Sequence, residues 1–421
     1  MEPLARSPLF RNLPPLLLLL LPLAGSGGRT VAARGSFWHI TDLHWDPSYT
    51  VTDNPGLVCA STGTRPAPNA GRFGHYHCDS PWDLIDSSIN AMKVILPEPD
   101  FIIWTGDDTP HVPNEQLGEE AVLSIVGNLT RLLQLAFPSG YYSEQLLNKT
   151  GYRVLVLNTN LYYDQNKLTE NVADPAGQFE WMDNILTRAA QKNEKAYIVG
   201  HVPPGFFEKK RSKPWFRPDF NRRYLELVQK HHAVIYGQFF GHHHTDSFRM
   251  FYDLQGNPIS TIFITPGVTP WKTTLPGVED GANNPGIRVF NYDPSTLLVE
   301  DSVTYYLNLT YANAMRERWE KEYRLCEAFQ VPDASPSSMH AVLERLAGTG
   351  CDLQKYYEFN SVSYDLSACD ADCRVDHICA IREVDFERYE QCLLREGTAA
   401  TPLAFIPLLI PTALTIYCAA L

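Results

Sequence analysis

Short apolar runs alternate with longer amphipathic segments along this chain of 421 residues. The short runs are rich in β-branched and aromatic residues, which predicts strands at 37–40, 101–104, 154–157, 197–199, 234–239, 250–252 and 262–264. Apolar residues spaced three and four positions apart predict helices at 82–95, 119–136, 178–192, 222–231 and 339–347. Strands that alternate with helices in this way are typical of an α/β fold.

Potential metal ligands directly follow four of the predicted strands. They are Asp42 and His44 in HITDLHWD, Asp107 in IIWTGDD, His201 in VGHVPPG, and His242 and His244 in FFGHHHTD. Imidazole and carboxylate groups together suit zinc or a similar first-row ion, and a carboxylate can bridge two ions because it has two oxygens. Two neighbouring cations activate water and hold the phosphoryl oxygens of a phosphodiester. The pattern therefore indicates a two-metal phosphoesterase site.

Each cluster has a plainer interpretation when it is taken alone. Asp42-Leu43-His44 is more often a solvated strand end than a ligand pair, and GHVPPG is more often a turn with a satisfied histidine. The three histidines at 242–244 could form a surface cluster that binds metal only adventitiously. Four such clusters at strand ends in one chain are difficult to produce by chance, which favours the metal site.

The order DLH, GDD, GHVPPG and GHHH resembles that of the calcineurin-like metallophosphoesterases. Longer strings, among them FWHITDLHWDP, IIWTGDDTPHVP and GQFFGHHHTDSFRM, resemble the acid sphingomyelinase-like phosphodiesterases, in particular their membrane-anchored 3b type. The resemblance extends over 37–392. It implies a four-layered α/β fold of two packed sheets flanked by helices, followed by a small helical subdomain that carries disulfides.

The resemblance also implies roles for individual residues. Asp42, His44, Asp107 and His244 would hold a first Zn²⁺, and Asp107, His201 and His242 would hold a second. His111, in DDTPHV, would contact the phosphate and assist the leaving group or stabilise charge in the transition state. Without the resemblance, His111 is a loop histidine of undecided role.

One motif of the family, GNH[DE], does not occur in this chain. Where it belongs, near 138–150, a predicted helix passes almost directly into the strand at 154–157, so several dozen residues are missing. The loss would weaken the second metal and lower the rate roughly 10²- to 10⁴-fold. It would also remove a central strand, whose neighbours must close up or leave backbone groups unpaired. Asn158 or Asn160 could substitute as an amide ligand, although an asparagine after a strand is usually a turn residue.

Both ends of the chain predict the secretory pathway. Residues 1–34 have an arginine-containing start, a leucine run and small residues, which is typical of a signal peptide. Residues 397–421 resemble a GPI-anchor signal with Gly397 as the candidate attachment region, although the polar spacer is short. A C-terminal membrane helix is the alternative, but two prolines and the absence of terminal basic residues argue against it. We therefore expect a secreted protein or one anchored by lipid to the extracellular face of the plasma membrane.

The cysteines agree with that compartment. The chain has nine, and Cys418 would leave with the tail, so an even number remains for disulfides whose pairing the spacing leaves open. The resemblance suggests Cys59–Cys78, Cys369–Cys373 and Cys379–Cys392, which leaves Cys326 and Cys351 as a further pair. The predicted N-glycosylation sites are Asn128, Asn148 and Asn308.

Composition limits the remaining choices. With 44% hydrophobic and 20% charged residues, the chain can bury a large core. The net charge of −13 argues against nucleic-acid binding, whereas bound cations would still attract a phosphate substrate. We expect a monomer with a catalytic domain at 35–331, a linker near 332–336 and a helical cysteine-bearing subdomain at 332–396. Four aromatic residues could line a substrate groove, although core packing is the better expectation for most of them: Tyr76, Trp82, Trp271 and Tyr292.

Two functions follow from these observations. The first is an extracellular zinc-dependent phosphodiesterase acting on phospholipid headgroups or on choline or nucleotide phosphodiesters. The second is a catalytically impaired, membrane-tethered form that binds lipid or a partner protein, because GNH[DE] is missing.

Overall fold

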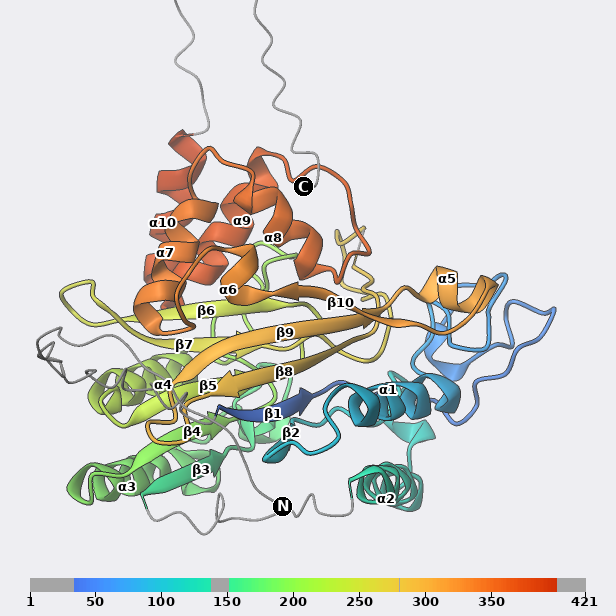
Figure 1. Ribbon diagram of the computed structural model, residues 1–421, viewed down its shortest axis with the longest axis horizontal. Helices are drawn as coiled ribbons and strands as arrows, with labels where there is room; N and C mark the ends of the chain where they lie inside the picture. The colour runs from blue at the N-terminus through green and yellow to red at the C-terminus, as the bar shows by residue number, and fades with distance from the viewer. Residues whose placement is uncertain (1–33, 138–150, 280, 400–421) are drawn as a thin grey trace, which may run out of the picture. The chain divides into compact units, whose positions relative to one another are not determined.

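Two five-stranded mixed sheets form the centre of the computed structural model, which describes residues 34–137, 151–279 and 281–399. The first sheet has the order β10-β9-β8-β1-β2, and the second has the order β3-β4-β5-β7-β6 (Figure 1). The strands of the first are β1 (Gly35–Ile40), β2 (Phe101–Trp104), β8 (Gly286–Tyr292), β9 (Val299–Leu307) and β10 (Trp319–Arg324). Those of the second are β3 (Tyr152–Val156), β4 (Lys195–Val199), β5 (Ile235–Phe240), β6 (Ser247–Tyr252) and β7 (Pro258–Ile264).

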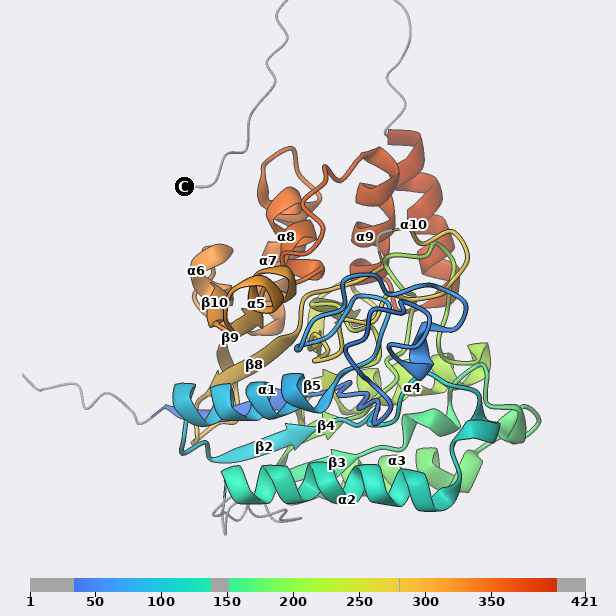
Figure 2. The same cartoon turned by 90° about the vertical axis from the view of Figure 1, so that its right-hand side faces the viewer.

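The two sheets pack face to face because alternate residues of each strand point inward. Phe37 of β1 and Phe239 of β5 meet between the sheets with ring centroids 5.3 Å apart. Their neighbours point outward: Trp38 packs with α1 (Trp82–Ile95) and α2 (Glu119–Ala136). Phe240 packs with α3 (Gln178–Gln191) and α4 (Pro218–His231) on the outer face of the second sheet. The predicted four-layered α/β fold is confirmed, and Figure 2 shows α1 and α2 beside the first sheet.

All of the predicted strands and helices are present, with ends that differ by a few residues. The helix predicted at 222–231 begins earlier, at Pro218, because proline fits the first turn of a helix. The sequence analysis did not predict β8, β9 and β10, or the short helices α5 (Leu309–Ala314) and α6 (Leu325–Ala328). These strands do not stand out as apolar runs in the sequence, because buried charged residues interrupt them. Examples are Arg288 of β8 and Asp301 of β9.

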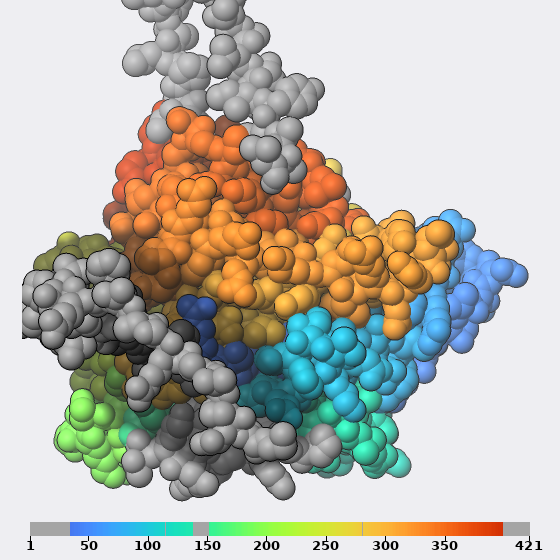
Figure 3. Space-filling model, viewed as in Figure 1, coloured from blue at the N-terminus to red at the C-terminus, as the bar shows by residue number. Residues whose placement is uncertain are grey.

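Four helices complete the described chain at its C-terminal end: α7 (Pro336–Leu346), α8 (Asp352–Asn360), α9 (Ala371–Arg382) and α10 (Phe386–Ala399). Apolar residues of α7, α8 and α9 share one core cluster with β6, β7 and β9. Figure 3 shows this C-terminal part, in orange and red, forming a continuous surface with the strands below it. The domain boundary at 331 stays a prediction.

Three disulfides join the cysteine pairs that the resemblance suggests: Cys59–Cys78, Cys369–Cys373 and Cys379–Cys392. The last two tie α9 to its preceding loop and to α10. The expected Cys326–Cys351 pair is wrong for this structure, because Cys326 is a free thiol. Cys326 follows β10, and its sulfur instead donates to the Glu300 carbonyl of β9.

The region of the missing motif lies at the edges of the sheets. Helix α2 ends at Ala136 and β3 begins at Tyr152, and the residues 138–150, with the predicted glycosylation site Asn148, lie outside the described part. Among the described strands β2 pairs with β1 alone and β3 pairs with β4 alone. Neither sheet has an internal gap among the described strands, and β2 and β3 are edge strands. The loss of a central strand stays a prediction.

The predicted terminal signals also fall mainly outside the described residues. Residues 1–33 and 400–421 are not described, whereas the candidate attachment residue Gly397 lies in the last turn of α10. None of the helices in the described ranges is both long and apolar enough to cross a bilayer.

Glu322 of β10 introduces a pH dependence into the stability of this fold. Ser363 donates to one of its carboxylate oxygens at 2.7 Å, and the other oxygen is enclosed without a hydrogen-bond partner among the described residues. Burial raises the pKa of Glu322 from 4.5 to about 8. Between these two values the folded chain keeps a proton that the unfolded chain releases, so Glu322 reduces stability as pH rises through this window.

We predict that Glu322→Gln leaves the melting temperature unchanged near pH 4, because both states of the parent are then mostly protonated. At pH 8 the variant should melt at least about 2 °C above the parent. Differential scanning calorimetry across this pH range measures the effect. An equal difference at both pH values would show that the carboxyl does not titrate as described.

Candidate metal centre

The loops that follow β1, β2, β4 and β5 meet at one end of the two sheets. Strand β1 runs parallel to β2, and β4 runs parallel to β5, so the carboxyl ends of each pair lie on the same side. These loops carry all the ligands that the sequence predicts. The structure brings them together: Asp42, His44, Asp107, His201, His242 and His244.

The potential ligand atoms form three groups, of which two share one carboxylate and the third consists of His44, His111 and His244. Asp42, His44 and Asp107 make up one group, and Asp107, His201 and His242 make up the other, with atoms within 4.8 Å of one another in each. Asp107 Oδ2 lies 2.9 Å from His201 Nε2 and 3.5 Å from His44 Nε2. A carboxylate between two sets of imidazoles is the arrangement expected for a bridging ligand.

Most of these ligands occupy left-handed backbone conformations, which are uncommon for residues other than glycine. The φ angles are 50° for Asp42, 38° for His44, 56° for Asp107, 71° for His242 and 59° for His244. Such conformations persist where the surroundings hold them and concentrate at functional sites. Here the Asp42 and His44 amides donate to the carbonyls of Gly106 and Asp107, at 2.9 and 3.0 Å, and so join the first two loops.

Gly241 is required where the loop after β5 approaches the loop after β1. A Cβ atom on Gly241 would lie 2.1 Å from Thr41 Oγ1 and 2.7 Å from Asp42 Oδ2. The His242 amide also donates to Asp42 Oδ2, at 3.0 Å. The close approach places the His242 loop directly against the Asp42 carboxylate.

The donor atoms fit a divalent first-row ion. His44 Nδ1 donates to the Thr109 carbonyl at 2.7 Å, which leaves Nε2 facing the two carboxylates. His44 Nε2 and His201 Nε2 face the carboxylates, and both are buried without an aligned hydrogen bond in the described protein. Buried polar atoms are normally paired, so these nitrogens indicate a missing partner with empty orbitals, such as Zn²⁺.

The electrostatics of the centre also favour a cation. Burial alone would lower the pKa of His44 and of His201, yet the neighbouring carboxylates raise them to about 10 and about 9. Burial would raise the pKa of Asp107, but the facing histidines, His201 above all, hold it well below its usual range. The centre therefore draws in positive charge, and a metal ion supplies that charge while leaving the imidazoles neutral.

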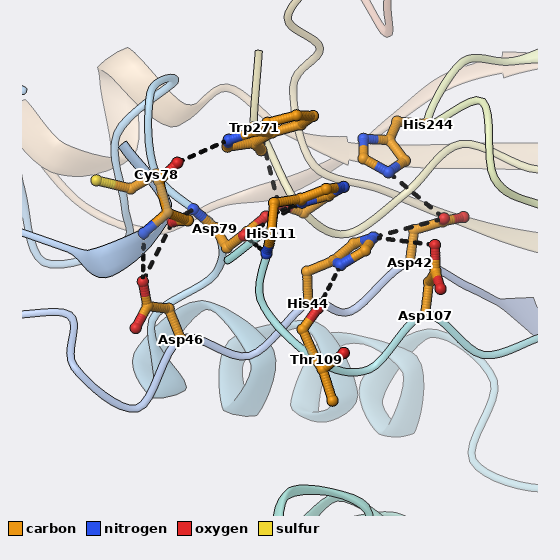
Figure 4. Close-up of polar contacts among 12 residues, drawn as sticks. Asp42, His44, Asp46, Cys78, Asp79, Asp107, Thr109, His111, His244 and Trp271 are labelled. Atoms are coloured by element: carbon orange, nitrogen blue, oxygen red, sulfur yellow. Dashed lines mark hydrogen bonds and ion pairs between the residues drawn. The ribbon is translucent and has the colours of Figure 1, made fainter. Parts of the chain in front are cut away.

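His111 lies beside the metal ligands and is held by a buried carboxylate. Its Nδ1 lies 2.9 Å from Asp79 Oδ1, and its backbone amide donates to Asp79 Oδ2 at 2.6 Å (Figure 4). One ring face stacks on Trp271 at 3.7 Å, and the His44 ring lies 4.1 Å away. The Asp79 contact places the proton on Nδ1 or shares it, so Nε2 is the atom available toward the centre.

A chain of polar contacts positions Asp79 in turn. The Asp79 amide donates to Ser61 Oγ at 2.8 Å, and Ser61 donates to Asp46 through its own amide and hydroxyl. Trp271 Nε1 donates to the Ser61 carbonyl at 3.2 Å. The Cys59–Cys78 disulfide closes this loop next to Asp79.

Sequence reasoning missed Asp79, because nothing in CDSPWD distinguishes it from an ordinary loop carboxylate. Of the four aromatic candidates, Trp271 is the one that stacks on His111, although it is mostly buried. Tyr292 belongs to the core between the sheets, and Trp82 packs on Trp45. Tyr76 donates to Asn284, away from the ligands.

The two asparagines considered as substitute ligands are exposed. Gln178 binds the backbone amide and carbonyl of Asn158, and the Asn160 carbonyl accepts from Asn166. Thr159 between them is buried, and its hydroxyl accepts from the His201 amide at 3.0 Å. The structure therefore turns the threonine, and not the asparagines, toward His201.

Comparison with known proteins identifies the family. The calcineurin-like phosphoesterase model matches residues 35–246, and the model of the acid sphingomyelin phosphodiesterase C-terminal region matches 257–399. The chain is 53% identical to the acid sphingomyelinase-like phosphodiesterase 3b of Homo sapiens, over 94% of this chain and 97% of the relative. The chain belongs to the acid sphingomyelinase-like phosphodiesterases. Members of this family are hydrolases. The calcineurin-like phosphoesterase model ends at Asp246, two residues after the last candidate ligand, His244.

Two further relatives of this phosphodiesterase family carry different names. The cyclic GMP-AMP phosphodiesterase SMPDL3A of Homo sapiens is 37% identical over 89% of this chain and 93% of its own length. The sphingomyelinase phosphodiesterase C of Dictyostelium discoideum is 32% identical over 86% of this chain and 93% of its own length.

The first comparison also bears on the missing block. It spans 445 positions, more than the 421 residues of this chain, so part of the relative has no counterpart here. The aligned 94% of this chain is about 396 residues. Subtracting them from the 445 positions leaves about 49 residues of the relative without a counterpart. Its size agrees with the several dozen residues that the sequence analysis found missing.

We predict that His111→Ala lowers kcat for a phosphodiester with an alkyl leaving group by about 10²- to 10⁴-fold, because that leaving oxygen needs a proton. The loss should be smaller for bis(p-nitrophenyl) phosphate, whose leaving group is a weak base. Steady-state kinetics with both substrates measure the difference. Asp79→Asn should also reduce kcat more for the alkyl phosphodiester than for bis(p-nitrophenyl) phosphate, since it disturbs the orientation of His111.

His232→Ala is the matched control for this prediction, because His232 is an exposed histidine whose ring binds the Gln229 carbonyl at the end of α4. It should keep the parental kcat. Equal losses for the two substrates in His111→Ala would contradict a role for His111 in proton transfer.

Proposed function

We propose that this chain is an extracellular phosphodiesterase that hydrolyses its substrate at a two-zinc centre. The observation that carries the proposal is the convergence of six carboxylate and imidazole ligands, with orphaned ring nitrogens, beside His111. Zinc when bound supplies Lewis-acid charge and an activated water. Asp107 stands between the two ligand groups and would keep the two positions close enough to serve one phosphoryl group.

The chain's own residues supply orientation and proton transfer. Asp79 fixes the His111 ring from one side, and Trp271 covers its face, so Nε2 has a single direction toward the centre. From there Nε2 donates a proton to the leaving oxygen of the bound phosphodiester, and the Asp79 carboxylate stabilises the protonated ring beforehand. Trp271 also shields the ring from bulk water.

For the substrate we propose a phosphodiester of a phospholipid headgroup, or a choline or nucleotide phosphodiester. The names of the relatives support this range, since they refer to sphingomyelinase and to cyclic GMP-AMP. The net charge of −13 opposes the binding of long nucleic acids.

We further propose that the chain acts as a monomer on the extracellular face of the plasma membrane, attached through a lipid anchor near Gly397. Three disulfides support an oxidising compartment. Asn308 is exposed, and its side-chain oxygen caps α5, which leaves its amide nitrogen for a glycan; Asn128 lies on α2. Release of the protein from cells by a phosphatidylinositol-specific phospholipase C tests the anchor.

A catalytically impaired form that binds lipid or a partner protein is the second candidate. It is favoured by the absence of GNH[DE] and by the group Asp107, His201 and His242, which has three described ligands and no described fourth. The two candidates differ in turnover and not in metal binding.

We predict that the purified chain, expressed without its terminal signals, hydrolyses bis(p-nitrophenyl) phosphate when zinc is present. Asp107→Asn should reduce the rate by at least about 10²-fold, because it weakens the ligand shared by both positions. Asp108→Asn is the matched control: Asp108 is the adjacent carboxylate, binds Trp104 Nε1 at 2.9 Å and belongs to neither ligand group. A folded, zinc-loaded parent without turnover would establish the impaired form instead.

We also predict that dialysis against a chelator abolishes hydrolysis and that zinc restores it. Removal should lower the melting temperature too, because the buried carboxylates lose their compensating charge. Metal content by mass spectrometry and melting curves measure both effects. Restoration by magnesium but not by zinc would contradict the choice of metal.

A further inference from the structure

The middle histidine of the GHHH loop faces away from the metal centre. His242 and His244 point toward the carboxylates of Asp107 and Asp42, whereas His243 is buried on the opposite side of the loop. There its Nδ1 lies 3.2 Å from Glu208 Oε2, and neither side chain is exposed. The loop is thus held by polar contacts on both sides. On one side His242 and His244 face the metal centre, and on the other side His243 contacts Glu208.

Glu208 makes four contacts from this buried position. Thr245 Oγ1 donates to its Oε1 at 2.7 Å, and Asn360 Nδ2 donates to the same oxygen at 2.8 Å. Arg249 Nη2 donates to Oε2, and the Arg249 side chain is also fully buried. Burial would raise the pKa of Glu208, but Arg249 and His243 hold it well below its usual range, so the carboxylate is charged.

These contacts join three parts of the chain. Glu208 lies seven residues after the ligand His201, and Thr245 follows the ligand His244. Asn360 ends α8, in the segment that the C-terminal family model matches. Its amide group also donates to the Asp246 carbonyl at 3.0 Å, and the Asp246 amide donates to the Asn360 carbonyl at 3.0 Å.

We propose that Glu208 is a positioning residue of the metal centre, which fixes the loop carrying His242 and His244 by binding His243, Thr245 and Asn360. The proposal rests on the proposed function in so far as the centre binds metal. It makes the C-terminal helices part of the scaffold that sets metal affinity. A purely structural role, in which Glu208 only neutralises Arg249 in the core, would affect stability and leave metal affinity unchanged.

The backbone conformation of the loop explains why it needs supporting contacts. Both His242 and His244 have positive φ angles, so the loop occupies a conformation that its residues do not favour on their own. Contacts behind a ligand are known to orient it and to set its affinity for metal. Glu208 reaches both flanks of His244, through His243 and Thr245.

The test compares zinc affinity with stability in full chains. Glu208→Gln removes the charge, and Thr245→Val removes one hydrogen bond while keeping the shape of the side chain. Affinity is measured by competition with a chromophoric chelator, and stability by melting of the metal-free chain. We expect zinc affinity to fall by about 10- to 100-fold in both variants. We also expect excess zinc to restore kcat to near the parental value.

Glu322→Gln at pH 6 is the matched control, because Glu322 is an enclosed glutamate with no described contact to the ligand loop. Its zinc affinity should equal that of the parent. If Glu208→Gln fails to fold, Thr245→Val still decides the question, since it alters a single contact. Variants that melt earlier but bind zinc as tightly as the parent would overturn the proposal.

Failure of the proposed activity is distinguishable from failure of this inference. A parent that binds zinc without hydrolysing a phosphodiester would remove the activity, whereas the affinity comparison would still decide the role of Glu208. A parent that binds no zinc would overturn both.

Discussion

The structure depends on the compensation of two neighbouring carboxylates, the buried Asp42 and the partly exposed Asp107, at the carboxyl ends of parallel strands. Asp42 could not remain charged inside the protein without positive charge nearby, and four histidines surround the two carboxylates: His44, His201, His242 and His244. Five of the six candidate ligands have left-handed conformations, which the surrounding contacts hold in place. Gly241 is needed where two loops touch.

Two further buried ion pairs support the same region from behind. Arg249 pairs with Glu208 under the GHHH loop, and Arg288 of β8 pairs with Asp246 at the end of that loop. Both pairs make additional hydrogen bonds, to Ser247 and the Phe206 carbonyl in the first and to Thr304 in the second. Through them the C-terminal helices and the strands β8 to β10 contribute to a centre whose ligands all come from the first part of the chain.

The sequence predicted the elements that follow simple periodicity and the ligands at their ends. It did not predict β8 to β10, because Arg288 and Asp301 interrupt the apolar pattern and become acceptable in a core only with partners from other strands. Asp79 and Glu208 were missed for a related reason: each is an unremarkable acid until folding places a histidine or an arginine beside it. The expected Cys326–Cys351 pair was wrong, since the count of cysteines carries no distances.

By itself the sequence determined the α/β class, the six candidate ligand residues, the family and the absence of GNH[DE], because these depend on residue type and local order. Only the tertiary structure decided that two groups of potential ligands share Asp107, that β2 and β3 are edge strands, and that Asp79 contacts the His111 ring. The physical reason is that hydrogen bonds and charge compensation act over a few ångströms in space, between residues such as Glu208 and Asn360 that are far apart along the chain.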